Sequence, residues 1–283
     1  MLSPEQIQFL KRTRKNTIGI AICLILFLSG FFIHGNTGLY INLSGFLIIM
    51  GGTLGATFLS YDMKRIEILF KVLKTAYGKQ TRQPSDIVKM LVDLSVKRRV
   101  KGVLSLQRDE SEVSIVFLKQ AIGLLVDGCS KDQIKESLGN EMYFFRMRRD
   151  ETLRVLQTMA DVAPSFGLVG SVVGLIGMLA GAGNSDVVMS TVPIALTSTL
   201  YGIVVANFIF LPFAASIREM TVKELFLQKI ITEGILAIHD DLHPRMLERT
   251  LKSFLTPSAR NGRLVSFQNV REKLDLEGLR ENV

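Results

Sequence analysis

The chain has 283 residues, of which 48% are hydrophobic, with a mean hydropathy of +0.31 and a formal net charge of +8. Charged residues make up only 21% of the chain, below the roughly 25% of ordinary soluble domains, so this composition argues against a soluble domain. The basic excess does not indicate nucleic-acid binding, because no basic stripe carries interleaved aromatic residues. Basic residues beside membrane spans explain it instead.

Two long stretches are almost free of charge. No Asp, Glu, Lys or Arg occurs from Thr17 to Tyr61, and only Asp186 occurs from Val162 to Ile217. A membrane-spanning helix needs about 20 apolar residues, so each stretch is long enough for two. We therefore predict four spans joined as two hairpins by short turns, at residues 17–33 and 39–60, and at 162–182 and 191–215.

The basic residues indicate the orientation of the spans. They flank the outer ends of both predicted hairpins, whereas the two turns contain no Lys or Arg. The positive-inside rule then places both termini and the region between the hairpins in the cytoplasm. The predicted order is a cytoplasmic segment 1–16, spans 17–60, a helical cytoplasmic domain 61–152, spans 153–215, and cytoplasmic helices and a tail 216–283.

The cytoplasmic parts carry helical periodicity interrupted by glycine and polar turns. A helix is expected to end at Gly78, the next to start at Ser85 and Asp86, and another at 130–138 to end at a glycine. Residues 140–158 are expected to run without a break into the third span. After the fourth span we expect a helix, a loop at His243 and Pro244, and a helix to Leu255.

Enzymatic chemistry has no positive signal. The sequence contains no GxxxxGK, HExxH or GxSxG motif and no CxxC pair. His239 and His243 are four residues apart with only Asp240 and Asp241 nearby, which does not favour a metal site. We expect neither an enzyme nor a cofactor.

Glycine recurs in the third span, DVAPSFGLVGSVVGLIGMLAGAG at residues 161–183. Spacings of three and four place these glycines on one helix face, where small residues let membrane helices approach closely. The fourth span repeats the pattern with Ala195, Thr199, Gly202 and Ala206. The predicted packing glycines are Gly167, Gly170, Gly174, Gly177, Gly181 and Gly202.

Prolines and hydroxyls add features beyond packing. Pro164 and Pro212 lie near the cytoplasmic ends of the third and fourth spans, where proline allows bending. Ser171 and Thr199 place hydroxyls at corresponding depth, either along an ion route or bonded to their own helix backbones. Ion conduction normally needs an intramembrane carboxylate, and none lies inside a span, so a partner would have to supply it.

Four segments carry a family resemblance: APSFGLVGSVVGLIGML, ALTSTLYGIVVANFIFLPFA, RVKGVLSLQRD and EGILAIHDDLHPRMLERTLKSFL. Together they resemble the MotA and PomA family of bacterial flagellar stator subunits, from the first span to about Arg260. The resemblance implies an all-α polytopic protein of the inner membrane. It implies five copies around two copies of a one-span MotB or PomB partner, whose aspartate carries H⁺ or Na⁺, and torque on the switch protein of the rotor.

The resemblance also assigns residues. Pro164 and Pro212 match the family's functional prolines, and Ser171, Ser198 and Thr199 match its ion-route hydroxyls. Arg99 matches the rotor-facing arginine, but the acidic residue expected eight positions later is Gln107, so Asp109 and Glu110 are the alternative carriers of negative charge. The expected rotor-contact residues are Arg99, Lys101, Gln107, Arg108, Asp109 and Glu110. The alternative is that this run is an ordinary solvated face.

Three questions stay open at this stage. Ser171 is intermediate between the threonine of sodium-driven members and the smaller or apolar residue of many proton-driven ones, and it favours protons weakly. An ExbB or TolQ type of energy-coupling subunit is the nearest alternative, but those proteins usually lack the extra hairpin at 17–60. The third reading is a non-conducting membrane scaffold whose glycines serve packing only.

Overall fold

The computed structural model describes residues 22–23, 25–27, 29–30, 37–78, 83–107, 109 and 115–255, and over these residues it contains helices and turns but no strand. The predicted segment 1–16, most of the predicted first span and the tail beyond Leu255 lie outside the described residues. The chain forms two compact units. One comprises Met1–Met63 with Leu156–Pro212, and the other Lys64–Val155 with Phe213–Val283.

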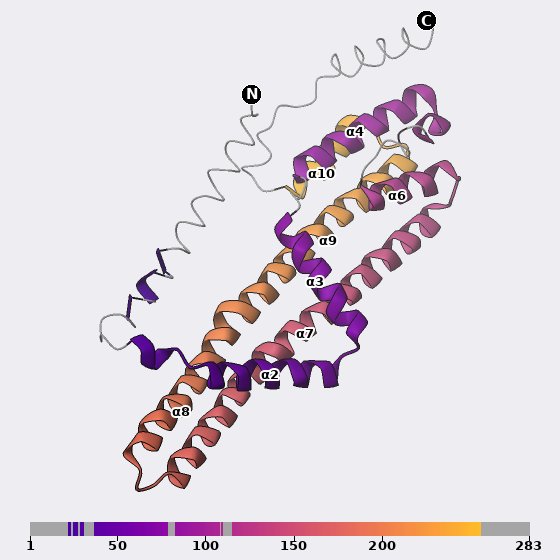
Figure 1. Cartoon of the computed structure of the whole chain (residues 1–283). Helices are drawn as coiled ribbons and strands as arrows, with labels where there is room; N and C mark the ends of the chain where they lie inside the picture. The colour runs from indigo at the N-terminus through magenta and orange to yellow at the C-terminus, as the bar shows by residue number, and fades with distance from the viewer. Residues whose placement is uncertain are drawn as a thin grey trace, which may run out of the picture. The chain divides into compact units, whose positions relative to one another are not determined.

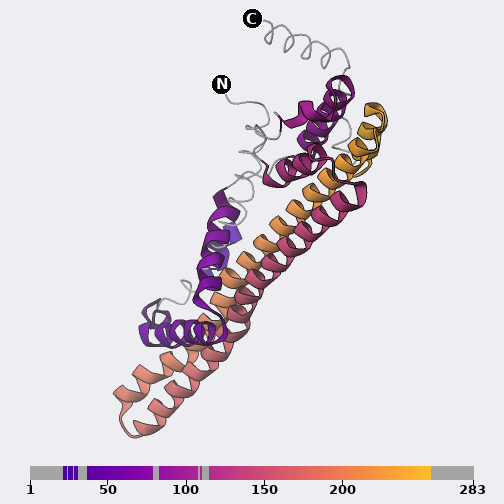
Figure 2. The same ribbon diagram turned by 90° about the vertical axis from the view of Figure 1, so that its right-hand side faces the viewer.

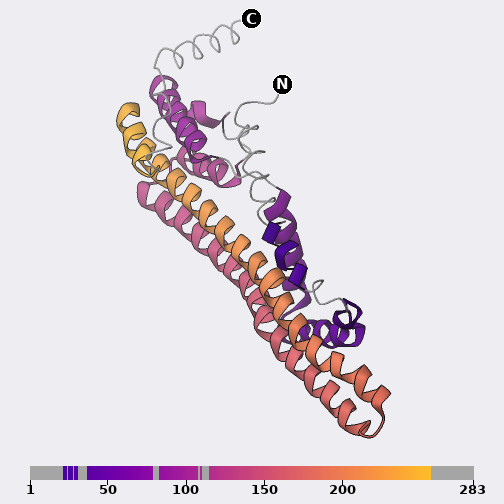
Figure 3. The ribbon, with the colours of Figure 1, turned by 90° about the vertical axis from the view of Figure 1, so that its left-hand side faces the viewer.

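A helical hairpin forms the centre of the first unit. It pairs the later part of α7 (Lys131–Ala180) with α8 (Ser185–Val205), and Figures 2 and 3 show the two helices side by side from opposite directions. Gly183 takes a φ of 105° in the turn, and the Asn184 side chain accepts a hydrogen bond from the Asp186 amide. This polar cap starts α8 six residues before the predicted start at 191.

Helix α2 (Leu43–Ser60) crosses this hairpin (Figure 1). Its start is fixed by Asn42, whose side chain accepts from the Gly45 amide, while residues Thr37–Tyr40 form a separate 3₁₀ turn, η1. The helix therefore begins at Leu43, after the predicted 39. The Tyr201 hydroxyl of α8 binds the Tyr40 carbonyl and accepts from the Asn42 amide at 2.8 Å, which anchors the start of α2 to α8.

Three helical stretches among the described residues are long and apolar enough to cross a membrane: Leu43–Ser60, Lys131–Ala180 and Ser185–His239. The last is continuous because α8 passes through a π turn, η3 (Ala206–Phe210), into α9 (Leu211–His239). The predicted second span (39–60) and third span (162–182) overlap the first two stretches, and the predicted fourth span (191–215) lies within the last.

The second unit has an apolar core at helical spacing. Its elements are α3 (Met63–Gly78), α4 (Pro84–Lys101), η2 (Val103–Ser105), α6 (Val116–Val126), the first part of α7, most of α9, and α10 (Pro244–Ser253). Helix α10 packs on α4 (Figure 1). Leu91, Leu118, Ile134, Ile235 and Leu247 are fully buried in this core.

Helix boundaries test the sequence analysis most directly. The continuous run from 140 into the third span is confirmed, and the predicted loop is present at His243, whereas Pro244 is already the first residue of α10. The predicted stop at Gly139 is wrong, because α7 continues through it. A glycine inside a helix costs only about 1 kcal/mol. Contacts with the apolar core by Ile134 and Leu138 before Gly139, and by Met142 after it, offset that cost.

The glycine packing predicts a stability difference between two alanine variants. A Cβ at Gly174 would lie 2.6 Å from the Ala195 amide nitrogen, whereas a Cβ at Gly51 would have no atom within 4 Å. Gly174→Ala should therefore lower the free energy of unfolding by about 1 to 3 kcal/mol through overpacking. Gly51→Ala, the matched control, should stay within about 1 kcal/mol of wild type.

The measurement is unfolding of the purified protein in detergent micelles. Equal stability of the two variants would contradict the close contact between α7 and α8.

Candidate functional site

The glycine face of α7 is occupied by α8 of the same chain. A Cβ at Gly167 would lie 3.0 Å from the Ser198 carbonyl oxygen, and one at Gly202 would lie 2.7 Å from the Ala163 carbonyl oxygen. The other predicted packing glycines are equally crowded: Gly170 by Ser198, Gly174 by Ala195, Gly177 by Thr191 and Gly181 by Val187. The two backbones thus approach so closely that larger side chains do not fit.

This approach brings Ser171 and Thr199 together. The Ser171 hydroxyl lies 2.5 Å from the Ala195 carbonyl oxygen, 2.5 Å from the Thr199 hydroxyl and 3.2 Å from its own-helix carbonyl at Gly167. A carbonyl can only accept, so the single Ser171 proton goes to Ala195, and Thr199 donates to Ser171. The two residues form a hydrogen-bonded hydroxyl pair across α7 and α8.

Exposed apolar side chains surround this pair. Leu168 and Leu175 lie three residues before and four after Ser171, and they share its helix face. Leu196 and Ile203 lie three residues before and four after Thr199, and they share its helix face. These four side chains are between 47% and 70% exposed. We call these four leucine and isoleucine residues, with Ser171 and Thr199, the hydroxyl face.

Ser198 belongs to a different side of α8. Its side chain is fully buried and donates to the Ile194 carbonyl at 2.7 Å, and its hydroxyl would lie 2.7 Å from a Cβ at Gly45 of α2. The structure therefore places Ser198 beneath α2 and separates it from Thr199, its neighbour in the sequence.

The predicted prolines lie at two kinds of helix position. Pro164 is half-buried inside α7 and close to Gly202. Pro212 follows the π turn, in which the Leu211 amide donates to the Ala206 carbonyl, and it lacks the N–H that would continue the ladder. A third proline, Pro193, lies inside α8 and was not predicted as a site residue; the Thr197 hydroxyl donates to its carbonyl at 2.6 Å.

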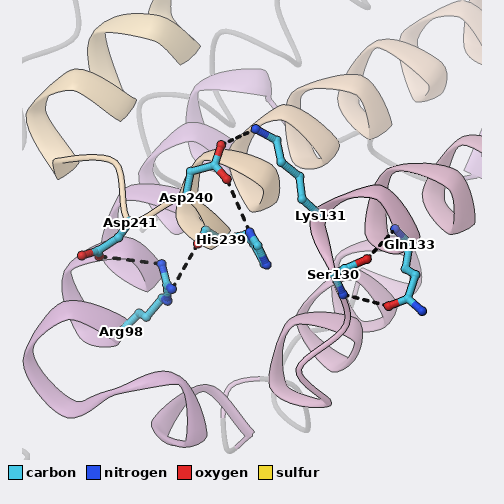
Figure 4. Close-up of polar contacts among 7 residues, drawn as sticks. All are labelled: Arg98, Ser130, Lys131, Gln133, His239, Asp240 and Asp241. Carbon is cyan, nitrogen blue, oxygen red and sulfur yellow. Dashed lines mark hydrogen bonds and ion pairs between the residues drawn. The ribbon is translucent and has the colours of Figure 1, made fainter.

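A polar cluster in the second unit fastens three helix ends (Figure 4). Arg98 of α4 donates to the His239 carbonyl at 3.2 Å and lies 3.7 Å from the Asp241 carboxylate. Lys131 of α7 lies 2.5 Å from the Asp240 carboxylate. The hydrogen bond between them lowers the pKa of Asp240 and raises the pKa of Lys131. None of these charges was predicted to have a role from the sequence.

The predicted rotor-contact residues have different surroundings. Arg99, Lys101 and Gln107 are exposed. The Asp109 carboxylate is paired with Lys97, whose Nζ lies 3.1 Å from Oδ1 and 3.0 Å from Oδ2 of Asp109. The Asp109 side chain is only 23% exposed and the Lys97 side chain only 19%. Arg108 and Glu110 lie outside the described residues.

Within the described part of the chain, no three His, Cys, Asp or Glu side chains are grouped as metal ligands. The His243 ring nitrogen instead accepts from the Arg245 amide and caps α10.

Comparisons with known proteins cover nearly all of this architecture. The family described as the MotA/TolQ/ExbB proton channel family matches residues 109–252, and the N-terminal region of motility protein A matches residues 17–102. YtxD of Bacillus subtilis is 32% identical over 84% of this chain and 87% of its own length. The chemotaxis protein PomA of Vibrio alginolyticus is 28% identical over 80% and 88%.

A solved structure shares the fold. The structure of C. jejuni MotAB matches with a TM-score of 0.81 and 27% identity, over 88% of this chain and 99% of the solved one. This likeness confirms the predicted all-α, multi-pass membrane fold. The match over residues 17–102 favours the MotA group over ExbB and TolQ, and the matched family is one of ion channels and not of enzymes. The chain belongs to the MotA/TolQ/ExbB proton channel family, within its motility protein A group.

Proposed function

We propose that the chain is a flagellar stator subunit that conducts protons together with a one-span partner and converts the flow into torque on the rotor. The observation that carries this proposal is the hydroxyl face. It is an exposed apolar surface of two membrane-spanning helices with the Ser171 and Thr199 hydroxyls at its centre. Such a face can pack against an apolar partner helix that carries one polar group.

The partner must bring a carboxylate. From Val162 to Ile217 the only acidic residue is Asp186, which lies in the first turn of α8, before the predicted fourth span at 191–215. An ion crossing an apolar span needs a charged or strongly polar site. The solved relative is of MotAB, and we infer a MotB or PomB type of partner for this chain, with an aspartate facing Ser171 and Thr199.

Assembly and orientation follow from the same proposal. Five copies would surround a partner dimer, each turning its hydroxyl face inward, with membrane lipid outside. Basic residues at the outer ends of both predicted hairpins support an inner-membrane orientation with the N- and C-termini in the cytoplasm. Arg99 and its neighbours would then contact the rotor's switch protein.

The prolines allow a helix pair to bend during each ion transfer. Pro164 and Pro212 each remove one backbone hydrogen bond, and the π turn at Ala206–Phe210 already departs from the regular α-helical ladder. We propose that these positions absorb small changes in helix direction while the glycine contact keeps α7 and α8 together.

Ion uptake by cells tests the function. Cells that express the chain with its one-span partner should take up protons, whereas cells that express either protein alone should not. Swimming speed should be unchanged when sodium is withdrawn. Absence of uptake with the partner present would support the scaffold reading, and loss of swimming without sodium would assign sodium as the coupling ion.

Two hydroxyl deletions test the geometry of the ion route. Thr199→Val keeps the side-chain shape but removes the donor to Ser171, so the ion flux should fall by about fivefold, the equivalent of one hydrogen bond. Ser198→Ala is the matched control, since that hydroxyl is buried beneath α2 and bonded to its own helix. Its flux should match wild type at equal protein levels.

The two variants are compared by proton uptake in cells that also express the partner. A larger loss for Ser198→Ala than for Thr199→Val would refute the assignment of the hydroxyl face.

A further inference from the structure

Asn207 is an exposed polar residue inside the predicted fourth span. Among the polar side chains at residues 191–215, all of which the structure describes, it is the one that is exposed. Thr197 and Ser198 are buried, and Thr199 is half-buried. An amide exposed at membrane depth is unfavourable unless another molecule completes its hydrogen bonds. The position of Asn207 therefore indicates a polar ligand.

The side-chain amide of Asn207 is held in one orientation. Its Nδ2 donates to the Ile203 carbonyl at 2.9 Å. A carbonyl oxygen only accepts hydrogen bonds, so the amide nitrogen must face the Ile203 carbonyl, and Oδ1 is the end turned away from it. The exposed side chain thus offers Oδ1 as an acceptor to a neighbouring molecule.

The π turn gives Asn207 a second acceptor, which is its main-chain carbonyl. In a regular α-helix this carbonyl would accept from the amide of Leu211, four residues later. In η3 the Leu211 amide donates to the Ala206 carbonyl instead. The next donor along a π ladder would be Pro212, which has no N–H. The Asn207 carbonyl therefore loses both helical donors, and the residue carries two carbonyl oxygens that can accept hydrogen bonds from a ligand.

Asn207 continues the hydroxyl face toward one end of the span. It follows Ile203, a member of that face, by four residues and so lies on the same side of the helix. The helix rises about 12 Å from Thr199 to Asn207. The predicted cytoplasmic end of the span, Ala215, lies as far again beyond it. In the proposed orientation Asn207 is therefore between the hydroxyl pair and the cytoplasm.

A partner carboxyl group that carries a proton must release it on this side. The proton needs an acceptor that stabilises positive charge, and from Val162 to Ile217 the only carboxylate is Asp186, near the other end of α8. An amide carbonyl is not the final acceptor, but it accepts hydrogen bonds from the O–H groups of water and hydronium. Water held by Asn207 can therefore receive the proton.

We propose that Asn207 is the release site of the ion route, where its two carbonyl oxygens bind the water that takes the proton from the partner's carboxyl group. In this step the carboxyl O–H bond breaks, its electron pair stays on the carboxylate, and a new O–H bond forms on water. The hydronium then leaves toward the cytoplasm. Asn207 binds the water and stabilises its positive charge, and it neither gains nor loses a proton. The inference rests on the proposed function, which supplies the proton-carrying partner.

Proton uptake by cells that express the full chain with its one-span partner tests the proposal, at equal protein levels. Asn207→Leu keeps the size of the side chain but removes Oδ1, so the flux should fall by about tenfold, the equivalent of one hydrogen bond to a charged group. Asn207→Gln keeps a carbonyl oxygen and should restore the flux to within about threefold of wild type. Ile209→Leu is the control, because Ile209 is an exposed apolar residue of the same π turn. Its flux should match wild type.

A solvent isotope effect separates proton release from a structural role in the π turn. Each flux is measured in H₂O and in D₂O. If water takes the proton at Asn207, the loss of Oδ1 slows that transfer until it limits the flux, and the ratio of the flux in H₂O to that in D₂O should be larger for Asn207→Leu than for wild type. A purely structural defect would lower both fluxes by the same factor and leave the ratio unchanged.

Three outcomes overturn the release site: a wild-type flux in Asn207→Leu, an equal loss in Asn207→Leu and Asn207→Gln, or a loss in Asn207→Leu with an unchanged isotope ratio. If any of these occurs while wild type takes up protons with its partner, the release site is wrong and the stator function stands. If wild type takes up no protons with its partner, the proposed function itself fails.

Discussion

Close approach of two helix backbones in lipid is the constraint on which the first unit depends. Lipid tails are as apolar as leucine, so no hydrophobic effect drives α7 and α8 together, and dispersion and interhelical hydrogen bonds must do so. Both need short distances. Gly167 and Gly202 allow carbonyl groups and Cα atoms of the two helices to meet directly. Only at that separation can a side chain as short as Ser171 reach the Ala195 carbonyl across the interface.

The second unit is stabilised by different physics. There an apolar core of leucine and isoleucine is buried away from water, and polar pairs decide which charges remain outside it. Lys97 and Arg98 are turned inward to Asp109 and to the end of α9, and Arg99, the next residue, is exposed. Three consecutive basic residues thus have separate roles, because the helix turns each about 100° from the last.

The sequence predicts the helices better than it predicts their contacts. The uncharged stretches and the glycine spacing depend on local order along the chain, and they correctly indicate the spans that lie among the described residues and the continuous helix from 140 into the third span. The start of α8 and the passage through Gly139 were missed. A cap at Asn184 outweighs hydropathy at the first position, and core contacts of Leu138 and Met142 outweigh glycine propensity at the second. The separation of Ser198 from Thr199 depends on α2, and the pairing of Lys97 with Asp109 depends on how the chain after η2 turns back toward α4. No spacing rule contains that information.

The hydroxyl pair limits how an ion can pass. The hydrogen bonds run from Thr199 to Ser171 and end on the Ala195 carbonyl. An amide carbonyl has no proton to hand on, so this chain of bonds orients groups and does not itself relay a proton along α8. In the proposed stator the carboxylate of the partner must therefore carry the ion past the pair. The Thr199 and Ser171 oxygens retain lone pairs that can accept a hydrogen bond from that carboxyl group when it is protonated. The hydroxyl face would then favour the neutral, loaded form of the partner at the depth where a charged form is least stable.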